Sequence, residues 1–238
     1  MSTLFYVEEC FTTQEETDLF CSEHDNSGKA VYTFNQTKGK GQYGNIWKSH
    51  ADLNLAYSVL LASERVKYSN FIFNYYTAVT VRDFIANLTR EEVKIKWPND
   101  LIINRKKICG MITEMRKIKG KSYFITGIGI NILQEKFENL PKAGSLLTQT
   151  GKRFDLHQTA SELHEYFSSR VETFVNEDLI LKEYNAHLFG KDSVSLFNLN
   201  GNRQNGIIRQ ALSNGRLEIE LENDGLKTFY HKEIEMLY

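Results

Sequence analysis

A pentapeptide near the middle of the chain combines groups suited to phosphate and metal-ion binding. It reads Lys96-Trp97-Pro98-Asn99-Asp100, and Lys107 and Gly110 follow shortly after it. Asp100 offers the hard oxygen ligand that Mg²⁺ prefers, and Asn99 can donate to a phosphate or a sugar. Lys107 would aim an ammonium group from the start of a strand, and Gly110 would leave room for a flat ligand. Taken alone, such a pentapeptide is more often an ordinary turn.

Two further stretches could approach a ligand through their backbones. Residues 36–47 hold three glycines and two lysines, so N–H and ammonium groups could surround a phosphate or a carboxylate. The spacing matches neither the P-loop nor the dinucleotide-binding motif, and a mobile surface loop is an equally good interpretation. The stretch Gly127-Ile128-Gly129-Ile130-Asn131 suggests close backbone approach, although such a pattern is usually a core strand.

The hydrophobic pattern predicts the elements that must position these stretches. Thr12 or Thr13 is expected to cap a helix that stops near Asp25, because Glu15 and Glu16 can complete a capping box. The other expected elements are strands at 29–35, 53–62, 93–96, 101–103, 108–115 and 122–131, and helices at 71–88, at 154–175 with Asp155 as its cap, and at 178–187.

The pattern changes after Gly190 to short alternating strands. They are separated by Asn200-Gly201, Asn214-Gly215 and Asp224-Gly225, and such pairs supply the positive φ angles of tight hairpin turns. We therefore predict two domains. Strands and helices mix in residues 1–189, and residues 190–238 form a small antiparallel β unit.

Composition and charge exclude several classes of protein. The 238 residues carry 29 basic and 30 acidic side chains, a net charge of -1, which gives no case for general binding to nucleic acid or membrane surfaces. No run reaches the roughly 20 apolar residues of a membrane helix, and the first residues lack a signal-peptide pattern. Cys10, Cys21 and Cys109 lack metal-binding spacing and fit reduced, buried thiols. We expect a cytoplasmic protein.

The three stretches together resemble the biotin protein ligases, which carry a GRGRxGxxW loop followed by KWPND, KxxG and GxGxN. Here these motifs read Gly39-Lys40-Gly41-Gln42-Tyr43-Gly44-Asn45-Ile46-Trp47, Lys96 to Asp100, Lys107 to Gly110, and Gly127 to Asn131. Order and spacing agree along nearly the whole chain. The resemblance implies an α+β fold with a class II synthetase-like catalytic domain, in which helices back a mixed sheet, and a small SH3-like C-terminal β-barrel.

The resemblance also implies a reaction. Members of the family join biotin and ATP, with Mg²⁺, to give biotinoyl-5′-AMP and pyrophosphate. They then transfer biotin to a lysine of a biotin carboxyl carrier domain in a biotin-dependent carboxylase. Some relatives carry an N-terminal winged-helix domain and repress transcription, whereas this chain begins directly at the catalytic strand, so we expect no specific DNA binding. A homodimer and a monomer are both open.

The resemblance assigns roles to individual residues. Lys107, Lys40 and Gln42 are the expected catalytic residues, and Asp100 is the expected metal ligand. The expected ATP-binding residues are Trp47, Lys96, Asn99, Asp100 and Asn131. The expected biotin-binding residues are Thr12, Thr13, Gln14, Gln36, Gly39, Lys40, Gly41, Gln42, Lys107 and Gly110.

The glycine loop departs from the family pattern. Arginine is usual where this chain has Lys40, Gln42 and Asn45. Lys40 keeps the positive charge, but the two amides do not. We therefore expect the adenylate to be held with less charge assistance, unless Lys38 or Lys48 supplies the missing charge.

Two alternatives to a biotin ligase remain at this point. Lipoate ligases share the fold, but Trp-Pro-Asn-Asp followed by Lys-x-x-Gly favours biotin. A non-catalytic relative that only binds biotin is the other alternative. The altered arginine positions favour it, whereas the intact Lys107 and Asp100 argue against it.

Overall fold

The larger part of the molecule is a seven-stranded mixed sheet in the order β1-β2-β3-β7-β6-β5-β4. The structure, a computed structural model, describes residues 3–21, 26–171 and 176–238. Strands β1 and β2 are parallel, and the other neighbours are antiparallel. The strands are β1 (Leu4–Tyr6), β2 (Ala30–Thr33), β3 (Asn54–Ala62), β4 (Lys94–Lys96), β5 (Asp100–Ile103), β6 (Lys106–Ile118) and β7 (Lys121–Asn131).

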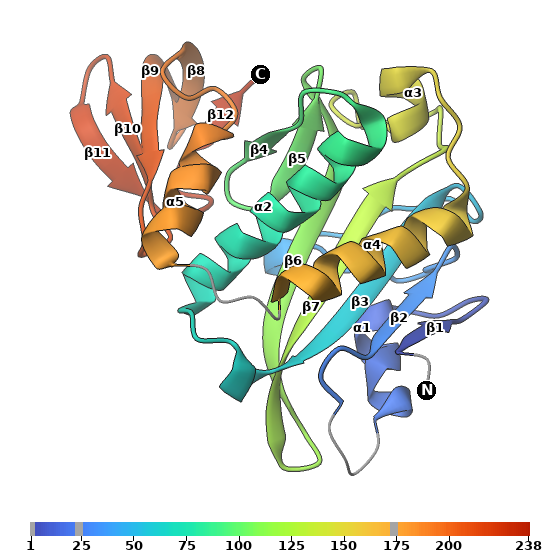
Figure 1. The fold of residues 1–238 in the computed structure, drawn as a ribbon. Coiled ribbons are helices and arrows are strands. Elements are labelled where there is room, and N and C mark those ends of the chain that lie inside the picture. The colour runs from blue at the N-terminus through green and yellow to red at the C-terminus, as the bar shows by residue number, and fades with distance from the viewer. Residues whose placement is uncertain (1–2, 22–25, 172–175) are drawn as a thin grey trace.

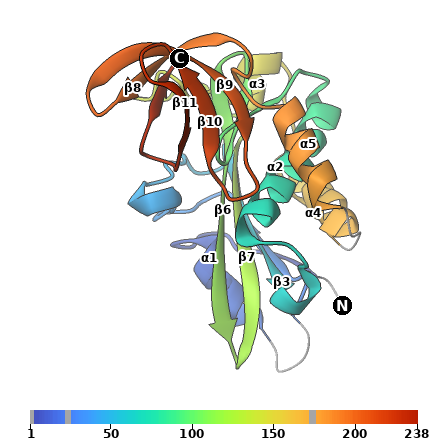
Figure 2. The ribbon, with the colours of Figure 1, turned by 90° about the vertical axis from the view of Figure 1, so that its left-hand side faces the viewer.

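Helices cover one face of this sheet, and shorter elements lie on the other face. Helices α2 (Asn70–Thr89) and α4 (Leu156–Val171) pack on the sheet, and α5 (Glu177–Ala186) packs against α2 (Figure 1). On the opposite side lie α1 (Thr13–Glu16) and the loop that holds the short turn η2 (Gln42–Gly44) (Figure 2). Every residue of β3 is buried because the sheet is covered on both faces. The remaining short elements are η1 (Thr17–Phe20), η3 (Ser63–Arg65) and α3 (Leu146–Thr150).

Helix α2 is delimited by local signals and held by aromatic packing. The side chain of Ser69 accepts a hydrogen bond from the Ile72 N–H, at 3.2 Å, and so caps the first turn. Arg90 ends the helix in the left-handed region with a φ of 65°. The Phe73 ring lies 4.9 Å from the Phe124 ring of β7, which attaches the helix to the centre of the sheet.

The end of the chain forms a second, five-stranded antiparallel sheet in the order β11-β10-β9-β8-β12. Asn200 and Gly201 join two of its strands with φ angles of 52° and 89°, the conformation that a two-residue hairpin turn requires. The expected α+β fold class is therefore confirmed, while the domain boundary at residue 189 stays a prediction. The strands are β8 (Val194–Leu199), β9 (Asn202–Ala211), β10 (Leu217–Leu221), β11 (Gly225–Phe229) and β12 (Glu235–Leu237).

The first predicted helix is wrong in length and in its capping box. Four α-helical residues are followed by a 3₁₀ turn that ends at Phe20, and residues 22–25 lie outside the described chain. Thr12 occupies the N-cap position, but its side chain makes no capping hydrogen bond. The Glu15 carboxylate instead lies 2.5 Å from the Lys40 ammonium, so a distant partner has replaced the local one.

The other predicted elements are present with small shifts. The Asp155 carboxylate accepts the Gln158 N–H at 2.8 Å, which confirms Asp155 as the cap of α4. The predicted continuation to residue 175 lies partly outside the described chain, which shows α4 to Val171. Strand β1 and helix α3 were not predicted, because each is only three to five residues long.

The described residues contain no helix that is long and apolar enough to cross a membrane. The three cysteines are unpaired and buried, as expected. Burial raises the pKa of the Cys10 thiol to about 12, and burial also raises the pKa of the Cys109 thiol. Neither thiol is therefore a ready nucleophile at neutral pH.

Candidate functional site

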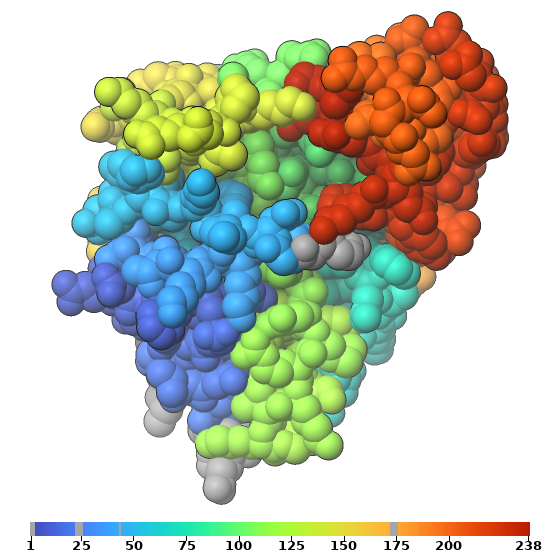
Figure 3. All heavy atoms as spheres, turned by 180° about the vertical axis from the view of Figure 1, so that it is seen from behind, coloured from blue at the N-terminus to red at the C-terminus, as the bar shows by residue number. Residues whose placement is uncertain are grey.

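A cavity lies on the sheet face opposite α2 and α4. Its walls come from α1, the loop of residues 36–47, strands β3, β6 and β7, the turn before β5, and His231 of the second sheet region. Figure 3 looks onto this face, where light-blue atoms of the loop region extend across the surface toward the red C-terminal part of the chain. The cavity volume of about 130 Å³ is below the roughly 300–1,000 Å³ of typical small-molecule sites. In this arrangement the loop leaves little space for a sizeable ligand.

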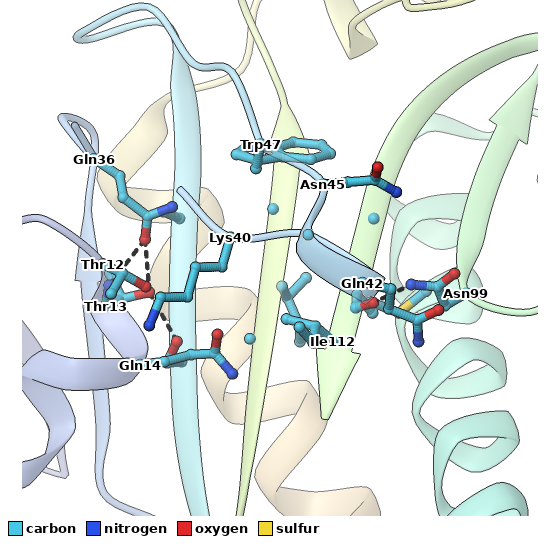
Figure 4. Close-up of a pocket in the computed structure, with 18 of the residues that line it drawn as sticks. Thr12, Thr13, Gln14, Gln36, Lys40, Gln42, Asn45, Trp47, Asn99 and Ile112 are labelled. Atoms are coloured by element: carbon cyan, nitrogen blue, oxygen red, sulfur yellow. Dashed lines mark hydrogen bonds between the residues drawn. The ribbon is translucent and has the colours of Figure 1, made fainter. Parts of the chain in front are cut away.

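One end of the cavity is a chain of hydroxyl and amide groups. The Gln36 side-chain carbonyl accepts hydrogen bonds from the Thr13 N–H, at 2.8 Å, and from the Thr13 hydroxyl, at 3.2 Å. The Thr13 hydroxyl also lies 2.8 Å from the Ser58 hydroxyl of β3. Figure 4 shows Thr13, Gln14 and Gln36 together on this side. Because the Gln36 carbonyl is occupied, the amide nitrogen remains as the donor that this side chain can offer a ligand.

The Gln14 side chain extends this polar end across the sheet. It is 3% exposed, and its amide nitrogen has no hydrogen-bond partner among the described residues. A Cβ added at Gly127 would lie 3.2 Å from Gln14 Cγ and Cδ, so the glycine makes room for this side chain. A buried donor without a partner costs about 1–3 kcal/mol, which a polar ligand would recover.

The glycine loop folds back on itself as a short ladder. The Trp47 N–H donates to the Gly39 carbonyl at 2.9 Å, and the Gly41 N–H donates to the Asn45 carbonyl at 2.8 Å. A Cβ at Gly39 would lie 2.5 Å from the Trp47 carbonyl and 2.7 Å from the Gln36 amide nitrogen. Gly39 is therefore required by close packing, which holds the loop against the polar end of the cavity.

These loop hydrogen bonds position the Trp47 indole against Gly110 of β6 and Gly129 of β7. A Cβ at Gly129 would come within 2.6 Å of the indole, and a Cβ at Gly110 within 3.0 Å. The Lys107 ammonium lies 5.6 Å from the centre of the indole ring. Within the described chain, the indole N–H is buried without an acceptor. A flat, donor-bearing surface therefore stands between the two ends of the cavity (Figure 4).

The other end of the cavity is charged. The Lys107 ammonium lies 2.7 Å from the Asp100 carboxylate, and these side chains are 34% and 18% exposed. The turn before β5 is held by the Met111 N–H, which donates to the Asn99 carbonyl at 3.0 Å, and by the Asn99 amide, which donates to the Met111 carbonyl. The Tyr184 hydroxyl donates to the Pro98 carbonyl at 3.0 Å. These bonds hold the turn that leads into Asp100, and Asp100 pairs with Gly110 of β6.

Positive charge gathers around Asp100. Burial is the main reason that the pKa of Lys96 falls below its ordinary value; the Asp100 carboxylate opposes this shift, and the ammonium groups of Lys107 and Lys142 add to it. A lysine whose charge is disfavoured by burial and by other cations is stabilised by an anion. This end of the cavity therefore suits a polyanionic ligand.

Residues 9–131 match the model of the biotin/lipoate A/B protein ligase family, more than half of the chain. The chain belongs to this family. The bifunctional ligase/repressor BirA of Bacillus spizizenii is 28% identical over 158 residues, and the biotin–[acetyl-CoA-carboxylase] ligase of Mycobacterium tuberculosis is 26% identical over 152 residues. These matches cover 64% and 62% of this chain, but 48% and 55% of the relatives. The chain thus spans about half the length of the curated relatives it matches.

Solved structures agree with the family at the level of the fold. The biotin protein ligase from Aquifex aeolicus, in complex with biotin and ATP, superposes with a TM-score of 0.81 at 23% sequence identity. The superposition covers 100% of this chain and 99% of that chain. The ligase fold therefore extends over both sheets, beyond the residues that the family model matches.

Most of the residues expected from the ligase motifs meet in the cavity. Gly39 packs within the loop, against Gln36 and Trp47, and Lys96 lies beside the charged end. Asn131 donates to the Gly144 carbonyl at 2.9 Å, and so anchors the segment that follows β7. The expected residues that line the cavity are Thr12, Thr13, Gln14, Gln36, Lys40, Gly41, Gln42, Trp47, Asn99, Asp100, Lys107 and Gly110.

The structure adds residues that the ligase motifs did not indicate. Ser58 is a polar residue inside an otherwise apolar, buried stretch of β3. A serine in such a stretch could have indicated from the sequence a side chain that faces a polar site. Ile112 lies two positions after Gly110 on β6 and therefore on the same face, which alternation could have shown. His231 comes from the second sheet region, and nothing in the local sequence indicated its approach to the cavity.

Proposed function

We propose that this chain is an ATP-dependent biotin ligase. It forms biotinoyl-5′-AMP and pyrophosphate from biotin and ATP, then transfers biotin to a lysine of a biotin carboxyl carrier domain. One observation carries the proposal: a single cavity joins the polar chain at Thr13 to the Asp100–Lys107 ion pair. Biotin needs both ends, because it carries a ureido ring at one end and the reacting carboxylate at the other.

The polar end suits a ureido ring better than the dithiolane ring of lipoate. A ureido ring has two N–H donors and a carbonyl acceptor, and the cavity offers hydroxyl oxygens at Thr13 and Ser58 and amide donors at Gln14 and Gln36. A dithiolane ring has no comparable groups and would leave the buried Gln14 amide nitrogen without a partner. Each unpaired group costs about 1–3 kcal/mol, which favours biotin.

The charged end suits attack of a carboxylate on the α-phosphorus of ATP. Both reactants are negative, so their approach needs fixed positive charge. Lys107 provides an ammonium group at the junction of the two ends, where it would exchange its Asp100 partner for the carboxylate and the α-phosphate. Trp47 would separate the substrates and offer its indole face to the adenine ring.

The residues around Asp100 also fit Mg²⁺. The described residues contain no group of three or more His, Cys, Asp or Glu side chains that would form a metal cage of their own. Mg²⁺ commonly binds one or two carboxylates together with substrate phosphates, and Asp100 supplies such a carboxylate. When bound, the ion would neutralise the phosphate charge; Asp100 would hold it, and Asn99 would position Asp100 through the turn.

The loop would close over the adenylate and keep water away from the activated acyl group. Lys40 is the expected loop cation, but its ammonium is now 2.5 Å from the Glu15 carboxylate, so it must change partners to reach a phosphate. Gln42 lines the cavity, and its side-chain carbonyl is buried without a partner among the described residues. The lysine amine of the carrier domain would then attack the acyl carbon, with AMP as the leaving group.

Biotin-dependent exchange of labelled pyrophosphate into ATP tests this function. We expect exchange with biotin and little exchange with lipoate or without an acid. Mass spectrometry of a carrier domain should then show one biotinylated lysine. Exchange that prefers lipoate would identify a lipoate ligase. Biotin binding without exchange would identify the non-catalytic relative.

A further inference from the structure

Helix α1, which carries Gln14 into the cavity, is too short to be stable by itself. It has four residues, and the Thr12 side chain at its N-cap makes no capping hydrogen bond. Isolated helices need about 12–15 residues, so contacts from elsewhere in the fold must hold this one. Its start is fixed by the bonds of Thr13 to Gln36 and Ser58. Its other end needs a support of its own.

Arg116 of β6 supplies that support. Its guanidinium Nη1 donates to the Gln14 backbone carbonyl at 3.1 Å, and the Thr17 hydroxyl donates to the same carbonyl at 2.8 Å. Nη1 also lies 3.3 Å from Oδ1 and 3.4 Å from Oδ2 of Asp18, in the turn η1 that follows α1. The last carbonyls of a helix have no partner within it, so an external donor is favourable here. One side chain of the sheet therefore ties down both α1 and η1 (Figure 2 shows α1 beside β6 and β7).

The guanidinium is itself fixed by a second carboxylate. Its Nη2 donates to Glu114, which lies two residues earlier on β6 and therefore on the same face of the strand. The side chains of Arg116, Asp18 and Glu114 are 26%, 44% and 39% exposed, so solvent and salt screen both ion pairs. What the arrangement supplies is geometry, because a planar fork held on two sides keeps one N–H directed at Gln14.

The backbone of Gln14 decides where its side-chain amide lies. The amide nitrogen is buried without a partner among the described residues, and Gln14 and Ile112 both line the cavity (Figure 4). A Cβ added at Gly127 would lie 3.2 Å from Gln14 Cγ and 3.2 Å from Ile112 Cγ2, so the side chain has little free space around it. A side chain packed in this way cannot easily compensate for a shift of its own backbone. Such a shift would therefore displace the amide.

We propose that Arg116 is a positioning residue for biotin, which holds the Gln14 amide in place for the ureido ring through the Gln14 backbone carbonyl. The identity of this ligand rests on the proposed function. Arg116 lies outside the ligase motifs and outside the cavity lining, so it acts on the ligand only through α1. Asp100 and Lys107, at the other end of the cavity, are held by separate bonds. The effect should therefore fall on biotin and not on ATP.

Calorimetric titration of the full chain with biotin tests this role without relying on catalysis. Arg116→Gln removes the charge and the fork, and we expect about tenfold weaker binding. Arg116→Lys keeps a donor for the Gln14 carbonyl and should restore part of the affinity. Lys117→Gln is the matched control, because Lys117 is exposed on β6 and points to the opposite face, and it should bind biotin like the wild type. Equal biotin affinity of the wild type and a folded Arg116→Gln variant would overturn the proposal.

A double-mutant cycle separates positioning from general structural support. Gln14→Ala removes the amide but keeps the backbone carbonyl that Arg116 holds, and it should itself weaken biotin binding. If Arg116 acts through that amide, Arg116→Gln should cost little further affinity in the Gln14→Ala background. Full additive loss in the double variant would refute the coupling.

Kinetics and melting give an independent check. In biotin-dependent ATP–pyrophosphate exchange, Arg116→Gln should raise KM for biotin about tenfold with little change in KM for ATP. An equal rise in both KM values, together with a lower melting temperature, would show a merely structural arginine and refute its positioning role. Biotin binding that depends on Arg116 without any exchange by the wild type would instead reject the ligase activity and leave the positioning role intact.

Discussion

Gly127 and Gly129 of β7 face Gln14 and Trp47, so under the proposed function alanine at each should affect only one substrate. A Cβ at residue 129 would lie 2.6 Å from Cε2 and 2.8 Å from Cζ2 of Trp47. Carbon atoms normally stay about 3.5–4.0 Å apart, so the indole must move by roughly 1 Å. A Cβ at residue 127 would meet Gln14 at 3.2 Å, so that side chain must give by only a few tenths of an ångström.

The expected magnitudes follow from what each side chain contributes. Stacking of a base on an aromatic ring is worth about 1–3 kcal/mol, which is roughly five- to 150-fold in affinity. We therefore expect Gly129→Ala to raise KM for ATP at least about tenfold, with little change in KM for biotin. Gly127→Ala should instead raise KM for biotin several-fold, because Gln14 loses part of its fit to the ureido ring.

Initial rates of biotin-dependent ATP–pyrophosphate exchange give both KM values for each variant. Thermal melting checks that both variants fold, and the two variants serve as controls for each other because they share a strand and a substitution. If folded Gly129→Ala keeps the wild-type KM for ATP, the Trp47 indole does not contact the nucleotide. Equal effects of both variants on both substrates would show a general distortion of β7 instead of two separate ends.

Three further outcomes are expected. Lys107→Ala should lower pyrophosphate exchange by about 100-fold or more without unfolding the protein, because it removes the central cation; near-normal exchange by a folded variant would contradict this. Gln42→Arg should slow adenylate release about fivefold, the gap of about 1 kcal/mol between charged and neutral hydrogen bonds, and equal release rates at low salt would refute it. Hydrogen bonding to Lys40 lowers the pKa of Glu15, so their ion pair is present above the ordinary pKa of about 4.3 and is lost as pH falls through the lowered value. Glu15→Gln should therefore increase proteolysis of the loop at neutral pH, and this difference from wild type should vanish in acid; an equal difference at both pH values would exclude the pair as its cause.

Much of the fold could be predicted because its signals are local. The apolar runs of β6 and β7, the helical face of α2 and the Asn200-Gly201 turn each depend on a few consecutive residues, and each is present. The capping box failed for the opposite reason. Glu15 had a local hydrogen-bond partner available at Thr12, but the fold brought Lys40 to it from 25 residues away. An ion pair with a distant residue cannot be seen in a local pattern.

The sequence by itself determined the family and the chemical inventory of the site, because the ligase motifs join unusual residue types at a defined spacing. Only the tertiary structure decided which groups meet. The hydroxyls of Thr13 and Ser58 form a hydrogen bond although they are 45 residues apart in the sequence. The Lys142 ammonium likewise lies over the ring of the distant Tyr238. Such contacts depend on how strands and segments are laid side by side, which burial of the whole apolar core selects. The motifs therefore predicted most of the residues of the cavity, and the tertiary packing of strands, helix α1 and loops decided their partners.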